Sequence, residues 1–87
     1  MYIVLVYDIE ESRVNKVNKY LKKYLHWIQN SVFEGELTEA QYLLMISGLR
    51  EIIEVDVDSV TIFKCKSRKH IEKVTLGVEK NTTDMII

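Results

Sequence analysis

The N-terminal segment is the feature that most constrains the fold. Residues 2–7 read Tyr-Ile-Val-Leu-Val-Tyr without a polar interruption, and the run ends in the carboxylate of Asp8. An unbroken apolar run rich in β-branched residues predicts a strand that is buried on both faces. We therefore expect a sheet whose central strand is Met1 to Asp8, with the other elements arranged around it.

The first helix is predicted directly after this strand. A polar turn follows the strand, in which Ser12 is a candidate N-cap for a helix from about Arg13 to Leu25. The apolar positions of this segment recur at helical spacing, so the opposite side of the helix is polar. That side is basic, and it carries Lys16, Lys19, Lys22 and Lys23.

The second helix begins with a recognisable N-terminal signal. Thr38 is followed three residues later by Gln41, which is the pattern of a capping box. Apolar residues at helical spacing continue from there, and we expect the helix to end near Glu54.

The remaining strands are shorter. Residues 27–37 have an extended pattern with polar and glycine interruptions, which predicts a bent or split strand, and residues 60–65 form a further strand. Residues 74–78 and 85–87 are apolar pieces that can each add an edge strand. This order predicts an α+β, ferredoxin-like βαββαβ sandwich with an extra C-terminal edge strand. Two helices would cover one face of an antiparallel sheet, which leaves the other face for a second subunit.

The chain length indicates one domain and a need for a partner. We expect one domain that spans 1–87, with a tail from about residue 79 that pairs with a partner subunit. A domain of this size buries only about 60% of the surface that its unfolded chain exposes. Dimerisation is a common remedy for such a small core. Cys65 is the only cysteine, so no intrachain disulfide forms, and a lone thiol suits the cytoplasm. The apolar N-terminal run is too short to span a membrane.

Charge is unevenly distributed along the chain. The net charge is −1, yet residues 1–33 hold five Lys or Arg against three acids, residues 34–60 hold one against seven, and residues 61–87 hold six against three. Two basic segments therefore flank an acidic one. This pattern fits either a polarised binding surface or an ordinary mixture of solvated helix faces.

Three segments in combination resemble a known family. They are Tyr2 to Ile9, the segment Ile-Gln-Asn-Ser-Val-Phe-Glu-Gly-Glu-Leu-Thr at 28–38, and Asp-Ser-Val-Thr-Ile-Phe at 58–63. Together with the basic first helix, they resemble the CRISPR-associated protein two (Cas-two) family over nearly the whole chain. The resemblance implies a ferredoxin-like homodimer in which Asp8 faces its symmetry mate. It also implies similarity to metal-dependent endonucleases acting on RNA or DNA, and a role in spacer acquisition as a bridge between dimers of the Cas-one integrase.

Asp8 is the candidate catalytic and metal-binding residue. Phosphodiester hydrolysis is helped by a hard cation such as Mg²⁺ (or Mn²⁺), which takes oxygen ligands. One carboxylate makes a poor site, whereas a symmetric dimer supplies two, and substrate phosphate and water complete the coordination. The alternative is that Asp8 caps the turn before the first helix.

Further residues are candidates for contact with nucleic acid. Tyr7 and Phe33 could stack on a base, although packing is favoured for Phe33, and Ser31 could bind a phosphate or satisfy local backbone. Trp27 stands where the family often has a basic residue, and it could stack instead. The basic helix face is the last candidate, and its members named for phosphate contact are Arg13, Lys16 and Lys19.

The sequence leaves more than one function open. The first is a Mg²⁺-dependent endonuclease centred on Asp8, and the second is a non-catalytic dimeric scaffold that bridges integrase dimers and binds duplex DNA. The second helix and the loop after it suit a protein partner, because they carry the acidic residues Glu51, Glu54, Asp56 and Asp58. A small-molecule sensor domain would need a pocket motif, and the sequence has none. Neither histidine has metal-ligand spacing, and no Gly-rich phosphate loop is present.

Overall fold

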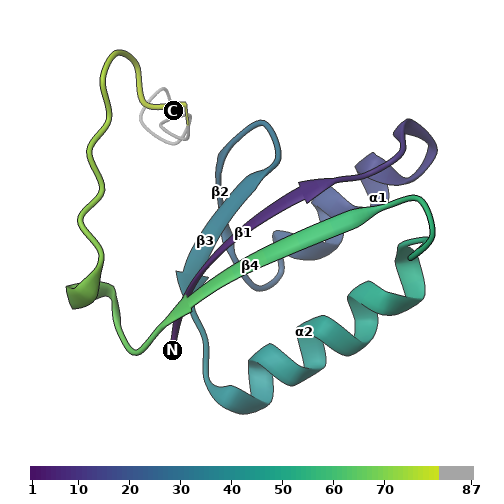
Figure 1. Cartoon of the computed structure of the whole chain (residues 1–87), viewed down its shortest axis with the longest axis horizontal. Helices are drawn as coiled ribbons and strands as arrows, with labels where there is room; N and C mark the ends of the chain where they lie inside the picture. The colour runs from purple at the N-terminus through teal and green to yellow at the C-terminus, as the bar shows by residue number, and fades with distance from the viewer. Residues whose placement is uncertain (81–87) are drawn as a thin grey trace.

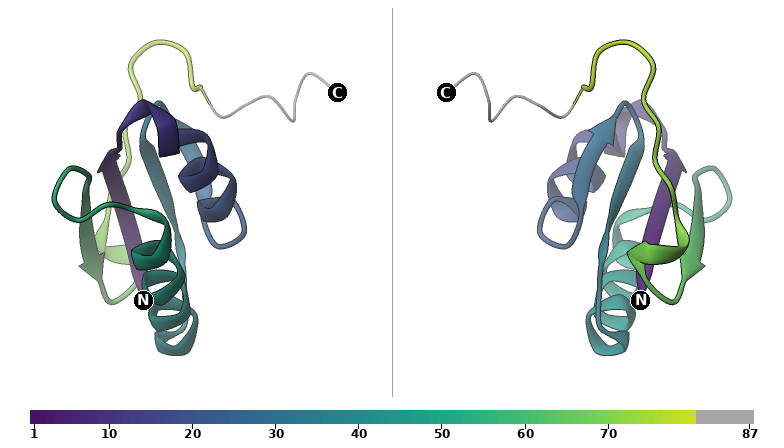
Figure 2. Two further views of the ribbon diagram at one scale, coloured as in Figure 1. Left: turned by 90° about the vertical axis from the view of Figure 1, so that its right-hand side faces the viewer. Right: turned by 90° about the vertical axis from the view of Figure 1, so that its left-hand side faces the viewer.

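The computed structural model describes residues 1–80, in which four strands and two helices form two layers (Figure 1). The elements are β1 (Tyr2–Asp8), α1 (Glu11–Leu21), β2 (His26–Gln29), β3 (Val32–Glu36), α2 (Glu39–Ile52), β4 (Ser59–Cys65) and the short helix η1 (Arg68–His70). The strand order is β2-β3-β1-β4, and every neighbouring pair is antiparallel. Both helices lie on the same side of the sheet (Figure 2). The predicted ferredoxin-like α+β arrangement, with β1 in the centre, is confirmed.

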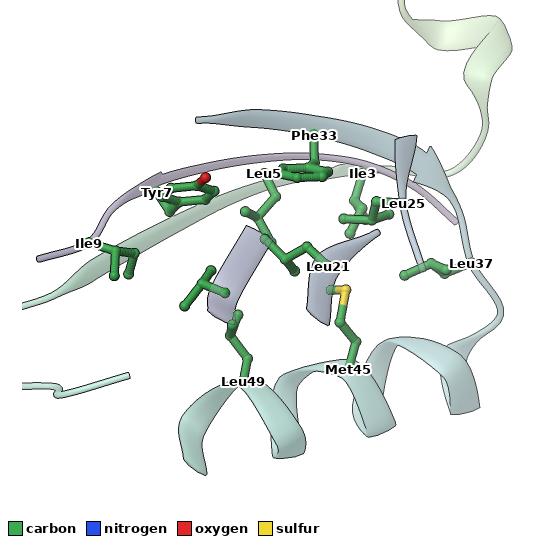
Figure 3. Close-up of a cluster of buried hydrophobic side chains, with 11 residues drawn as sticks. Ile3, Leu5, Tyr7, Ile9, Leu21, Leu25, Phe33, Leu37, Met45 and Leu49 are labelled. Atoms are coloured by element: carbon green, nitrogen blue, oxygen red, sulfur yellow. The ribbon is translucent and has the colours of Figure 1, made fainter. Parts of the chain in front are cut away.

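The core lies between the sheet and the two helices (Figure 3). Alternate residues of β1 point toward the helices, and Ile3 and Leu5 are fully buried there. The same cluster includes Phe33 from β3, Leu21 from α1 and Met45 from α2. Packing of this kind, rather than helix propensity, accounts for most of the stability of short helices.

The other side of the sheet is here called the open face. Cross-strand register places Val4 of β1 opposite Glu34 of β3 and Phe63 of β4, and Val6 opposite Val32 and Thr61. Val4 and Val6 are only half-buried, so the central strand is not covered on both faces as its apolar run predicts. The run is apolar on both sides of the strand because Val4 and Val6 form a half-buried apolar surface on the open face.

The first helix differs from its predicted limits at both ends. Glu10, not Ser12, is the N-cap, and its carbonyl accepts bonds from the amides of Arg13 and Val14. Ser12 lies inside the first turn, where its hydroxyl donates to Glu10. The helix ends at Leu21 rather than near residue 25, because residues 22–24 form a turn before β2.

The middle of the chain matches its predicted pattern. The expected split strand is the hairpin of β2 and β3, which turns at Asn30 in the left-handed region with φ of 42°. The capping box before α2 is complete, because Thr38 Oγ1 accepts from the Gln41 amide at 3.1 Å and Gln41 Oε1 accepts from the Thr38 amide at 2.8 Å.

The predicted edge strand at residues 74–78 is not formed. After β4 and η1 the chain turns away from the free edge of β4 and runs over the open face (Figure 2), where Lys73 contacts Glu34. Among residues 1–80 this segment pairs with no strand, and Leu76 is 94% exposed. The other predicted piece, residues 85–87, lies outside the described residues.

The contact between the helices depends on Gly48, and its replacement by alanine is expected to destabilise the protein. A Cβ built at this position would lie 2.1 Å from the Tyr20 hydroxyl. That hydroxyl donates to the Met45 carbonyl at 3.0 Å, so it has little freedom to move away. Alanine is the better helix former, but overpacking of this kind typically costs about 1–3 kcal/mol. Urea denaturation measures the loss, and Ser47→Ala on the exposed side of α2 is the matched control.

Candidate functional site

Asp8 is the last residue of β1 and its side chain is on the open face. It alternates with Val4 and Val6 along the strand, and it lies opposite Ser59 of β4. The residue is exposed, and among residues 1–80 its carboxylate has no hydrogen bond or ion pair. The alternative that Asp8 caps the turn before the first helix is wrong, since within residues 1–80 its side chain accepts no hydrogen bond from that turn.

A second carboxylate lies in the neighbouring connection and is fully engaged. Asp58 has a buried side chain, which accepts from Arg13 Nε at 2.7 Å and from an Arg13 terminal nitrogen at 2.9 Å. It also accepts from the amide of Glu10 at 2.9 Å and from the amide of Glu54 at 2.8 Å. The Arg13 guanidinium, helped by these two amides, holds the pKa of Asp58 far below its usual range. Asp58 is therefore a buried, hydrogen-bonded part of the fold and not an exposed member of the acidic segment.

Arg13 is correspondingly less available than the sequence indicates. Its guanidinium faces Asp58, and the hydrogen bonds to that carboxylate raise the pKa of Arg13. A weaker ion pair, at 3.6 Å, joins it to Glu10. Contact between Arg13 and a phosphate stays a prediction, and it would have to use the exposed quarter of the side chain.

The two aromatic candidates near Asp8 both point into the core. Phe33 is fully buried and Tyr7 nearly so, with their rings stacked at a centroid distance of 6.1 Å (Figure 3). The Tyr7 hydroxyl accepts from Asn18 Nδ2 at 3.3 Å. Neither ring offers a face to a nucleotide, so the packing interpretation of Phe33 holds and the suggestion that Tyr7 stacks on a base is wrong.

The β2–β3 hairpin brings one candidate close to Asp8. The Ser31 carbonyl accepts from the Tyr7 amide at 3.1 Å, which places Ser31 beside the end of β1. Trp27 pairs with Phe33, so it lies on the core side of the sheet, where it packs against the core, and its Nε1 donates to the Asn30 carbonyl at 3.0 Å. Of these two residues, only Ser31 adjoins Asp8.

The lysines on α1 and in the turn after it form a separate surface. Lys16, Lys19 and Lys23 line a shallow hollow of about 160 Å³ between α1 and α2, with Tyr20 and Ile52. This hollow is on the helical layer, whereas Asp8 alternates with Val4 and Val6 and so lies on the open face, on the other side of the sheet. Within one subunit, the predicted basic face and the predicted catalytic carboxylate are thus not brought together.

The sequence gives little sign of a polar network at the far end of the open face. The Tyr2 hydroxyl donates to Glu34 and accepts from Arg68 at 2.9 Å, and Lys73 donates to Glu34 at 2.9 Å. These contacts attach the segment after β4 to the sheet. The only sequence signal is that both Tyr2 and Glu34 occupy strand positions on the face opposite the core.

Loss of stability at high pH is expected from this network. Burial, followed by the bond to Glu34, raises the pKa of Tyr2 to about 12, whereas an unfolded tyrosine titrates near 10. The folded state therefore keeps a proton that the unfolded state loses, so the stabilisation is present below pH 10 and is lost as the pH rises toward 12. The free energy of unfolding of a Tyr2→Phe variant should fall less over this interval than that of the wild type. Tyr42→Phe is the matched control.

The carboxylates of one subunit do not make a metal site. Among the described residues no group of three or more His, Cys, Asp or Glu side chains converges on a point. Asp8 nevertheless offers a free oxygen donor of the kind Mg²⁺ prefers, which fits a site completed by a second copy, by phosphate and by water.

No helix within residues 1–80 is long and apolar enough to cross a membrane.

Comparison with known proteins gives a consistent result. Residues 1–73 match the family described as CRISPR associated protein Cas2. Proteins named CRISPR-associated endoribonuclease Cas2 are 52% identical in Pyrococcus furiosus and 49% identical in Thermococcus kodakarensis, each over the full length of both chains. A solved structure titled crystal structure of cas2 superposes with a TM-score of 0.83 at 44% identity, and it covers 92% of this chain and 90% of its own. Streptococcus pyogenes Cas2 superposes with a TM-score of 0.72 at 25% identity, over 86% of this chain and 100% of its own.

Proposed function

Because the chain belongs to the CRISPR-associated protein Cas2 family, we propose that it is a CRISPR-associated nuclease that cleaves phosphodiester bonds of RNA or DNA. The relatives named endoribonucleases make RNA the first substrate to test. In this proposal the active form is a homodimer in the cytoplasm, and Asp8 from each subunit holds a shared Mg²⁺ or Mn²⁺.

The observation that carries this proposal is the state of Asp8. The carboxylate is exposed at the end of the central strand and has no partner within residues 1–80, while the neighbouring Asp58 is buried and fully hydrogen-bonded. A carboxylate with no structural partner is free to bind a cation. When bound, Mg²⁺ would polarise the scissile phosphate and lower the pKa of a water molecule. Ser59 lies opposite Asp8 on the same face of the sheet, and in this proposal its hydroxyl hydrogen-bonds the same phosphate.

The open face supports the dimer in this proposal. Its centre is apolar, with Val4 and Val6 half-buried and Phe63 still 59% exposed. Such a face on a small domain favours association with a second copy. If two open faces meet about a twofold axis that passes near the ends of the two β1 strands, one site receives an Asp8 carboxylate from each subunit.

Removal of the metal is the direct test. Purified protein is incubated with labelled RNA and with labelled duplex DNA in Mg²⁺, in Mn²⁺ and in EDTA. We expect cleavage of at least one substrate with either metal and no cleavage in EDTA, with activity restored by excess Mg²⁺. Absence of cleavage under all conditions, or cleavage that persists in EDTA, would refute the metal-dependent mechanism.

A second function is favoured by the exposed lysines of α1. The basic hollow on the helical layer suits the backbone of a DNA duplex, and a dimer presents two copies of it. This supports a scaffold that holds DNA between dimers of the Cas-one integrase during spacer acquisition, with exposed Glu51, Glu54 and Asp56 facing the protein partner. An Asp8→Ala dimer that still binds duplex DNA and still supports integration would favour the scaffold. Charge reversal at Glu51 and Glu54 that leaves integrase binding intact would count against the assigned protein surface.

A further inference from the structure

The end of the pairing between β1 and β4 is extended by a side chain. Asp8 and Ser59 are the last residues of this ladder. The next residue on the β4 side is Asp58, and its Oδ1 accepts from the amide of Glu10, two residues beyond Asp8, at 2.9 Å. Asp8 therefore lies between two links that join the same segments. One is the backbone pairing of β1 with β4, and the other is the bond from the Glu10 amide to the Asp58 side chain. This arrangement fixes the direction in which the chain leaves β1.

Asp58 is itself held from two further elements. Arg13 in the first turn of α1 contacts both of its carboxylate oxygens, at 2.7 and 2.9 Å, and the Glu54 amide from the end of α2 donates at 2.8 Å. The side chain is completely buried. Rotation of the carboxylate would break several charge-assisted bonds at once, so its position is strictly determined. Asp58, which directly precedes β4, therefore connects the segment that carries Asp8 to the start of α1 and to the residues just after α2.

We propose that Asp58 and Arg13 are positioning residues, which hold the segment from Asp8 to Glu10 so that the Asp8 carboxylate projects correctly for the site shared by two subunits. This inference rests on the proposed role of Asp8 as a metal ligand. It gives Arg13 a task other than the phosphate contact expected from the sequence. The effect on the reaction can be large, because a displacement of about 1 Å at a reacting group can cost roughly 100-fold in rate.

The test uses two substitutions of different severity in the full chain. Asp58→Asn keeps the size of the side chain but places an amide NH₂ where N–H donors point. Arg13→Lys keeps the positive charge that a phosphate would attract, yet it lacks the planar fork of two nitrogens that matches the two carboxylate oxygens. Glu36→Gln is the matched control, because it removes an exposed ion pair with the N-terminal amine, at 3.1 Å, at the opposite end of β1. Each variant is assayed well below its own melting temperature, as a confirmed dimer, for kcat, KM and Mn²⁺ affinity by electron paramagnetic resonance.

Positioning predicts one pattern of results and phosphate contact another. We expect both variants to lose roughly 10- to 100-fold in kcat and to bind Mn²⁺ more weakly, with KM unchanged and the control like the wild type. A folded Asp58→Asn dimer with normal kcat and Mn²⁺ affinity would overturn the inference while leaving the nuclease proposal intact. An effect of Arg13→Lys on KM alone would overturn it in favour of phosphate contact. Failure of the wild type to cleave, in contrast, refutes the nuclease proposal itself and with it the inference.

Discussion

Replacing Asp8 by asparagine is expected to lower Mg²⁺-dependent cleavage by at least about 100-fold without changing stability or association. Asparagine keeps the shape of the side chain but loses the negative charge that attracts the cation. Stability should be unaffected because, within residues 1–80, the Asp8 carboxylate has no partner to lose. Initial rates on labelled RNA, thermal melting and sedimentation measure the three properties.

The matched control is Asp56→Asn, which makes the same change at an exposed aspartate between α2 and β4. It should retain full activity. An Asp8→Asn dimer that cleaves at the wild-type rate would contradict the shared carboxylate site and leave the DNA scaffold as the function to pursue. A large fall in the melting temperature of Asp8→Asn would instead mean that the carboxylate has a structural role.

Much of the fold is predictable because its signals are local. The capping box of Thr38 and Gln41 involves residues three positions apart, and the hairpin at Asn30 needs only a polar interruption between two apolar runs. The beginning of α1 is different. Its N-cap is Glu10, whose amide is bound by Asp58, a residue 48 positions away in the sequence. A side-chain contact of that range leaves no pattern in the segment it organises, so Ser12 is the better candidate on local evidence.

The position of Asp8 at the end of the central strand was predictable, whereas the directions of the side chains around it were less so. An apolar run ending in a carboxylate marks Asp8 plainly, but uniform hydrophobicity in residues 2–7 hides which side chains face the helices. Tyr7 and Phe33 therefore remain candidates for stacking until the register shows both on the core side. The same limit applies to Arg13, since a basic residue bound to a buried aspartate looks like any other residue of a basic helix.

Introducing a charge at the centre of the open face is expected to separate the proposed dimer. Phe63 lies opposite Val4 and is 59% exposed in the single subunit. In a twofold dimer, Phe63→Asp would bury two unpaired carboxylates, which costs several kcal/mol, so the dissociation constant should rise on the order of 100-fold or more. Cleavage should fall in parallel at protein concentrations where the variant is monomeric, because each subunit alone has only one Asp8. Sedimentation and cleavage are measured over the same concentration series.

Leu43→Asp is the matched control for this substitution. Leu43 is 58% exposed on α2, in the helical layer on the opposite side of the sheet, so the same change there should leave both association and cleavage intact. A Phe63→Asp protein that remains dimeric would show that association uses another surface, and the two Asp8 carboxylates would then have no reason to meet. A folded monomer that cleaves as fast as the wild type would contradict the shared site directly, because one exposed carboxylate would then be sufficient for the reaction.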